Sequence, residues 1–210
     1  MAIYNAIAGT IGAGKTTVCK ELSQYIPVSY EPKSPYLERF YENPKKWAFH
    51  MQVWMIQERR GQALELEVAS FEHVRIDRWP GIADRTCFED TIFREMLYKQ
   101  GNLSKVEYEM CRDMHNRYWK PSMAPKNIIY LRVSAETSIA RVRERNRNAE
   151  IEVSDEYLRD LHRRYEEWAK EMRGDFFHIV DWNEPDMDKI YQILRDHCFP
   201  TDDYTEVEWS

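Results

Sequence analysis

A glycine-rich segment near the start of the chain constrains the fold most. Residues 9–16 read GTIGAGKT, follow an apolar run over 3–8 and precede a helical pattern over 17–25. Glycine permits positive φ angles that turn backbone N–H groups inward, and the N-terminus of the next helix adds positive partial charge. This order of strand, loop and helix is typical of a phosphate-binding loop, so the sequence predicts that the chain binds a nucleoside triphosphate.

The residues of this loop have distinct expected roles. Lys15 is expected to reach the outer phosphates, and the hydroxyl of Thr16 is expected to bind Mg²⁺. The residues expected to contact the nucleotide are Gly9, Thr10, Ile11, Gly12, Ala13, Gly14, Lys15, Thr16 and Thr17.

Composition limits the size and the partners of the protein. The 210 residues, 43% of them hydrophobic, suffice for one domain, which we expect over 1–200, with an acidic and mobile tail over 201–210. The net charge of −6 argues against a nucleic-acid-binding surface. The four cysteines are scattered without metal-type spacing, and no apolar run is as long as a membrane span. We therefore expect a cytoplasmic protein with reduced thiols and neither membrane nor nucleic-acid partners.

Short apolar runs alternate with longer amphipathic stretches, which is the pattern of an α/β fold. The predicted strands cover 3–8, 27–30, 81–83, 128–133 and 176–180, and the predicted helices cover 17–25, 43–72, 91–99, 105–118, 135–147, 155–172 and 187–197. This order predicts a parallel sheet of three to five strands that is flanked by helices.

The remaining polar residues narrow the class of nucleotide-binding protein. The chain lacks the Asn-Lys-x-Asp segment with which GTPases read guanine, and only Ile82-Ala83-Asp84 approaches the apolar, acid-terminated strand of motor ATPases. An arginine-rich helix follows the strand at 128–133, with Arg141, Arg143, Arg145 and Arg147 at alternate positions. Such a helix suits a lid, here about 141–153, that closes over phosphates; a solvated helix face is the alternative, and the glycine-rich loop favours the lid.

Several further segments accompany the loop in a fixed order. They are Glu31-Pro32, Tyr41 to Trp47 with Gln52, Asp84-Arg85-Thr86 with Asp90, the lid from Arg141 to Glu150, and Glu156-Tyr157-Leu158 with Leu161-His162 and Glu167-Trp168. Together with the loop, these segments resemble the deoxynucleoside kinases of the deoxycytidine, deoxyguanosine and deoxyadenosine kinase type, over a stretch from Ala6 to about Trp168. The resemblance implies a P-loop kinase fold with a five-stranded parallel sheet, a homodimer, and transfer of the γ-phosphoryl of ATP to the 5′-hydroxyl of a deoxynucleoside.

The resemblance also assigns catalytic roles. Glu31, at the carboxyl end of a predicted strand, is expected to be the general base for the 5′-hydroxyl. Arg85 is expected to orient the hydroxyl and the phosphoryl oxygens, with Asp84 near Mg²⁺; Asp77-Arg78 is a competing pair that reads as part of a turn. Lys15, Arg145 and Arg147 complete the expected catalytic set, and Arg141 and Arg145 are also expected to bind ATP.

The expected substrate contacts divide between sugar and base. Tyr41 and Glu150 match positions that bind the 3′-hydroxyl, whereas Gln52 can read a base edge because it carries both a donor and an acceptor. Arg59 and Asp90 match a pair at the end of the base pocket. Buried charges need partners, so we expect these two to bridge and to favour purine deoxynucleosides, deoxyadenosine slightly ahead of deoxyguanosine, with deoxycytidine as a further substrate.

Two other readings stay open at this point. A nucleoside monophosphate kinase of the thymidylate-kinase type would share the loop and the lid, but it needs basic residues for the acceptor's phosphate where this chain offers Glu31, Tyr41 and Gln52. A non-catalytic nucleotide-binding protein would have no use for Glu31.

Overall fold

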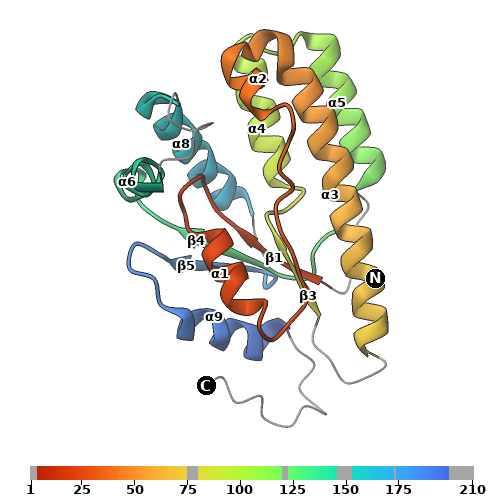
Figure 1. The fold of residues 1–210 in the computed structure, drawn as a ribbon, viewed down its shortest axis with the longest axis vertical. Coiled ribbons are helices and arrows are strands. Elements are labelled where there is room, and N and C mark those ends of the chain that lie inside the picture. Colours follow the sequence, from red (N-terminus) through yellow and green to blue (C-terminus); the bar gives the residue numbers. More distant parts are fainter. Residues whose placement is uncertain (1–3, 75–79, 120–122, 146–152, 173, 199–210) are drawn as a thin grey trace.

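The computed structural model describes residues 4–74, 80–119, 123–145, 153–172 and 174–198 (Figure 1). Its centre is a five-stranded parallel sheet, as the sequence predicts. The strands are β1 (Tyr4–Ala8), β2 (Val28–Ser29), β3 (Gly81–Asp84), β4 (Ile128–Arg132) and β5 (Phe177–Asp181). They are arranged in the order β2-β3-β1-β4-β5, so β1 lies in the middle with β3 and β4 beside it.

Helices connect and flank these strands. They are α1 (Lys15–Leu22), α2 (Leu37–Glu42), α3 (Pro44–Val74), α4 (Glu89–Lys99), α5 (Lys105–Tyr118), α6 (Ala135–Arg145), α8 (Asp155–Glu171) and α9 (Met187–Ile193), the last continued by a π-helical turn over Leu194–Cys198. The long helix α3 stands beside α5 and α4, whereas α1 and α9 cover the face of the sheet that is in front in this view (Figure 1).

Most predicted elements are present within one to three residues. The helix α2 was not predicted, because its six residues are too few to show a helical period. The first helix begins at Lys15 rather than at 17, since the left-handed Gly14 (φ 100°) is its N-cap and the lysine belongs to the first turn. The end of the helix predicted over 135–147 and the tail at 201–210 lie outside the described residues.

Two apolar cores hold the sheet between its helices. Ile7, Ile129, Leu131 and Trp182 pack with α1 and α9 on one face, whereas the other face packs Tyr130 with residues of α4 and α8. All four cysteines are buried and unpaired, as expected for packed thiols. Among the described helices, none combines the length and apolarity needed to cross a membrane.

Candidate active site

The loop after β1 has the backbone geometry of a phosphate cradle. Gly12 and Gly14 have φ angles of 78° and 100°, which L side chains rarely adopt. A Cβ at Gly12 would also lie only 2.4 Å from the carbonyl oxygen of Ser138, so α6 packs directly on the loop. The positive φ angle and the close approach of α6 therefore both require glycine at position 12.

Lys15 is held inside this loop. Its Nζ atom donates hydrogen bonds to the carbonyl oxygens of Gly9 at 2.7 Å and Thr10 at 2.8 Å. Burial, aided by the positive charge of Arg85, lowers the pKa of Lys15 from 10.5 to about 8. An incoming anion would counter both effects, so this ammonium group is suited to meet phosphate oxygens.

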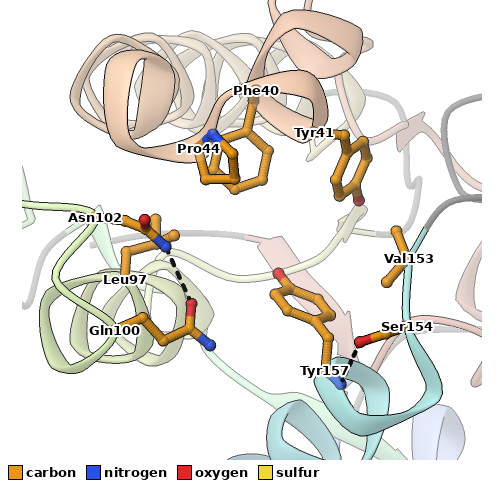
Figure 2. Close-up of a pocket in the computed structure, with 9 residues that line it drawn as sticks. All are labelled: Phe40, Tyr41, Pro44, Leu97, Gln100, Asn102, Val153, Ser154 and Tyr157. Carbon is orange, nitrogen blue, oxygen red and sulfur yellow. Dashed lines mark hydrogen bonds between the residues drawn. The ribbon is translucent and has the colours of Figure 1, made fainter.

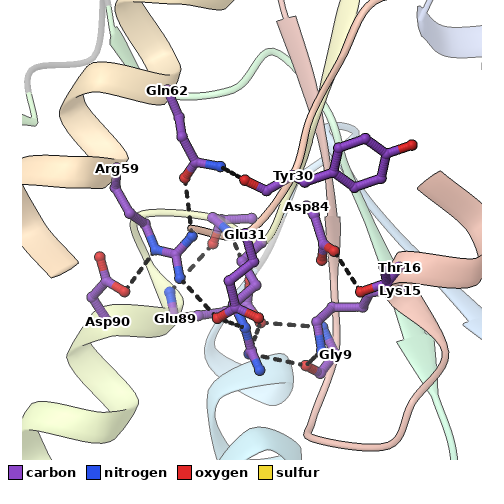
Figure 3. Close-up of polar contacts among 12 residues, drawn as sticks. Gly9, Lys15, Thr16, Tyr30, Glu31, Arg59, Gln62, Asp84, Glu89 and Asp90 are labelled. Carbon is purple, nitrogen blue, oxygen red and sulfur yellow. Dashed lines mark hydrogen bonds and ion pairs between the residues drawn. The ribbon is translucent and has the colours of Figure 1, made fainter. Parts of the chain in front are cut away.

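Thr16 and Asp84 form a pair of oxygen donors below the loop. The hydroxyl of Thr16, in the first turn of α1, donates to Oδ2 of Asp84 at the end of β3 over 2.8 Å (Figure 3). The other carboxylate oxygen of Asp84, Oδ1, is buried and has no hydrogen-bond partner among the described residues. A hydroxyl and an unpaired carboxylate oxygen are the hard ligands that Mg²⁺ prefers, so these two residues fit the predicted metal.

Glu31 lies two residues beyond β2 and faces two arginines. Its Oε1 atom lies 2.5 Å from Nε of Arg85 and 3.5 Å from Nη2 of Arg59. Burial tends to raise the pKa of Glu31, but the charges of Arg85, Arg59 and Lys15 outweigh burial and lower it. The side chain is one-third exposed (34%), so an ionised carboxylate is open to a substrate at this point.

Arg59 and Asp90 form the bridge that the sequence predicts. Nε of Arg59, on α3, lies 2.8 Å from Oδ1 of Asp90, on α4, and both side chains are almost fully buried. Burial tends to lower the pKa of Arg59, but Asp90 and Glu31 raise it above its ordinary value. Oδ2 of Asp90 is buried with no partner among the described residues, which leaves one acceptor for a ligand.

The other predicted substrate residues lie further out. Tyr41, on α2, lines a pocket opposite Tyr157 of α8 (Figure 2). The remaining lining residues of this pocket are Phe40, Pro44, Leu97, Gln100, Asn102, Val153 and Ser154. Gln52 is buried on α3, seven residues before Arg59 and therefore on the same side of the helix.

The lid arginines are partly described. Arg141 donates to the carbonyl oxygens of Ala13 at 3.2 Å, Trp182 at 3.0 Å and Asn183 at 2.9 Å, so it joins the loop to the segment after β5. Arg145 is exposed at the last residue of α6. Arg147, Glu150 and the competing Asp77-Arg78 pair lie outside the described residues, and their roles stay predictions.

Comparison with known proteins decides the family. The family model "Deoxynucleoside kinase" matches residues 6–196. The chain belongs to the deoxynucleoside kinase family. It is 32% identical over 196 residues to the deoxyadenosine kinase of Dictyostelium discoideum, covering 90% of this chain and 77% of the relative. It is also 32% identical over 169 residues to the deoxyadenosine/deoxycytidine kinase of Bacillus subtilis, covering 77% and 74% of the two chains.

Solved structures agree with this assignment. The deoxyadenosine kinase of M. mycoides with bound dCTP is 33% identical, has a TM-score of 0.75, and is matched over 91% of this chain and 96% of that one. The same enzyme with bound dATP has a TM-score of 0.71 at 32% identity over 91% and 96% of the chains. The protein is thus a deoxynucleoside kinase, a phosphotransferase that acts on a nucleoside. This family membership excludes the monophosphate-kinase and the non-catalytic alternatives.

Three polar residues of this kinase site were not predicted. Gln62 donates to the carbonyl oxygen of Tyr30 at 2.6 Å and accepts from Nη1 of Arg59 at 3.3 Å, so it ties the chain before Glu31 to α3 (Figure 3). Glu89 and Tyr165 contact Arg85. None of the three stands in a recognisable motif; only their burial as polar groups, visible once the fold is known, reveals them.

Proposed function

We propose that this kinase uses ATP and Mg²⁺ to phosphorylate the 5′-hydroxyl of a purine deoxynucleoside, deoxyadenosine slightly ahead of deoxyguanosine, with deoxycytidine as a further substrate. The observation that carries the proposal is the buried Arg59–Asp90 pair, which lies against Glu31 and has one carboxylate oxygen without a hydrogen-bond partner in the part of the chain that the structure describes. A base-reading pair next to a carboxylate that can take a proton is what transfer to a nucleoside requires.

In the proposed reaction, the loop amides and Lys15 hold the β- and γ-phosphates of ATP. Glu31 accepts the proton of the 5′-hydroxyl as the hydroxyl oxygen attacks the γ-phosphorus, while the bond from the γ-phosphorus to the bridging oxygen breaks and ADP leaves. Arg85 holds Glu31 and the phosphoryl oxygens in line. Thr16 and Asp84 would hold Mg²⁺, which neutralises phosphate charge. We propose that Arg145 and Arg147 meet the charge that develops on the transferring group, and that Arg141 supports ATP binding through the loop.

Base choice is proposed to depend on hydrogen-bond pairing. Adenine and cytosine offer an amino donor to Oδ2 of Asp90 and a ring acceptor to Arg59, whereas the carbonyl of guanine accepts from Arg59. Gln52 would read a further base edge, and Tyr41 and Glu150 would bind the 3′-hydroxyl. The methyl group of thymine offers the pair no hydrogen bond, so thymidine should be a poor substrate.

A panel of the four deoxynucleosides with Mg·ATP tests this proposal directly. We expect kcat/KM for deoxyadenosine or deoxyguanosine to exceed that for thymidine by roughly 10–100-fold, because an unpaired buried polar group costs about 1–3 kcal/mol. Thymidine as the best substrate would refute the base assignment and leave the family membership intact.

We further propose that the kinase is a homodimer. Leu64 and Val68 on α3 and Val106 and Met110 on α5 are exposed apolar side chains, and the two helices lie side by side (Figure 1). Burial of such residues favours association of two copies. Sedimentation equilibrium checks the expectation of twice the 25.4 kDa chain mass; a monomer at micromolar concentration would contradict it.

A further inference from the structure

A buried carboxylate joins the loop to the turn that carries Arg85. Glu89, the first residue of α4, has no exposed surface. Its Oε2 atom accepts the backbone N–H of Thr86 at 2.6 Å, and Oε1 accepts the backbone N–H of Gly9 at 3.2 Å. Oε1 also lies 3.3 Å from Nη1 of Arg85. One carboxylate thus fixes the start of the phosphate-binding loop relative to the proposed catalytic arginine.

A tyrosine from a distant helix completes this cluster. The hydroxyl of Tyr165, in α8, accepts from Nη1 of Arg85 at 2.8 Å and donates to Oε1 of Glu89 at 2.8 Å. Burial raises the pKa of Tyr165 well above its ordinary value, and the charge of Glu89 raises it further, so the hydroxyl keeps its proton and stays a donor. The helix α8 is therefore hydrogen-bonded to Arg85 itself.

Arg85 needs such support because its backbone is strained. Its φ angle of 80° makes it the one non-glycine residue with positive φ among the described residues. A residue in this region persists only where its surroundings determine its conformation. The two ends of the guanidinium are used differently: Nε faces Glu31, whereas Nη1 is held by Glu89 and Tyr165.

We propose that Tyr165 and Glu89 are positioning residues for phosphoryl transfer, which hold Arg85 in the strained conformation that places Nε beside Glu31. This inference rests on the proposed role of Arg85. The alternative is a purely structural role, in which Tyr165 and Glu89 only satisfy the hydrogen bonds of buried polar groups and stabilise the folded protein. The two readings differ in what they predict for kcat, because misplacement of a catalytic group by about 1 Å can cost 10²-fold in rate.

The decisive variant is Tyr165→Phe, which removes one hydroxyl and keeps the ring. The ring packs edge-on against Trp168 and Phe93 with centroid distances of 6.0 and 6.3 Å, contacts that phenylalanine also makes. The matched control is Tyr130→Phe. Tyr130 is equally buried and stacks on Tyr165 at 6.4 Å, but its hydroxyl bonds to Glu166 at 3.2 Å, away from Arg85.

We expect Tyr165→Phe to lower kcat by about 10–100-fold with less than about a threefold change in KM for the deoxynucleoside. Tyr130→Phe should keep kcat within about twofold, and both variants should have similar thermal unfolding midpoints. Glu89→Gln keeps the shape of the side chain and removes its charge. Like Tyr165→Phe, it should lower kcat and leave the KM for the deoxynucleoside nearly unchanged.

A double-variant cycle with Arg85→Gln separates this inference from the proposed role of Arg85. If Tyr165 acts through Arg85, Tyr165→Phe should change kcat by less than about twofold in the Arg85→Gln background. A large loss in Arg85→Gln with no loss in Tyr165→Phe would overturn the inference and leave the role of Arg85 intact. Losses that multiply would also overturn it, and an unchanged kcat in Arg85→Gln would refute both.

Discussion

Oε1 of Glu31 lies 2.5 Å from Nε of Arg85, and this contact joins the proposed base to the proposed phosphoryl-orienting cation. Arg59 approaches the same oxygen at 3.5 Å. Glu31 therefore connects two charged groups. We propose that the contact with Arg85 serves transfer and that the contact with Arg59, which pairs with Asp90, serves recognition of the base. Because the carboxylate is shared, a change in either pair is expected to affect the other.

Loss of the loop lysine should abolish transfer. Lys15→Ala removes the ammonium group that is expected on the β- and γ-phosphates, so kcat with Mg·ATP should fall by at least about 10². Lys15 does not belong to the proposed deoxynucleoside site. The affinity of the variant for deoxyadenosine, measured by calorimetry, should therefore lie within about threefold of the affinity of the parent enzyme. Near-normal kcat would show that the loop does not act in catalysis.

The affinity for ATP should depend on pH through the same residue. The pKa of Lys15 is lowered from 10.5 to about 8, so the free enzyme carries the charge below that pH and loses it above. Bound phosphates raise the pKa again, so binding above pH 8 must take up a proton, and affinity should fall by up to about tenfold per unit of pH.

Calorimetry with a non-hydrolysable ATP analogue checks this dependence. Titrations in buffers of different ionisation enthalpy should show proton uptake approaching one at pH 9 and little at pH 6.5. Lys15→Arg, whose guanidinium stays charged, is the matched control and should remove the uptake. Equal uptake in both proteins would assign the titration to another group.

Replacement of the proposed base tests the chemistry directly. Glu31→Gln is nearly isosteric but cannot accept a proton, so kcat should fall by roughly 10²–10⁴ with a smaller change in substrate affinity. The arginines lower the pKa of Glu31 below 4.5, so the carboxylate stays ionised between pH 5 and 7. Protonation of Glu31 should therefore not reduce the kcat of the parent enzyme in this pH range. A loss below about tenfold in the variant would move the base role to Asp84.

The sequence predicts the parts of this molecule that local patterns encode. The strands appear as apolar runs, the loop as a spaced motif, and Arg59 and Asp90 as matches to a family pattern. The contact between Tyr165 and Glu89 joins residues 76 positions apart, and neither carries a periodic or motif signal. Such contacts depend on how α8 packs against α4, which only the tertiary structure shows.

The lid arginines are expected to act mainly in the transition state. Arg145 ends α6 and Arg147 follows two residues later, so both belong to the segment expected to cover the phosphates. Alanine at either position should lower kcat by about 10²–10³ and ATP affinity by less than about fivefold, since the guanidinium meets charge that develops during transfer. The reverse pattern in steady-state kinetics and analogue binding would make them ground-state ATP ligands.

Base choice should change when the buried pair is removed. Asp90→Ala with Arg59→Met deletes both charges together, which avoids leaving one of them unpaired in the interior. The double variant should lose purine activity and gain thymidine activity relative to purines by at least about tenfold, because the apolar pocket accepts the methyl group and presents no unsatisfied donor. The single variant Asp90→Ala is the control, because it leaves Arg59 with Glu31 and Gln62 as its partners. It should lose stability and purine activity and should not gain thymidine activity. Thymidine phosphorylation that does not rise relative to deoxyadenosine in the double variant would show that base selection lies elsewhere.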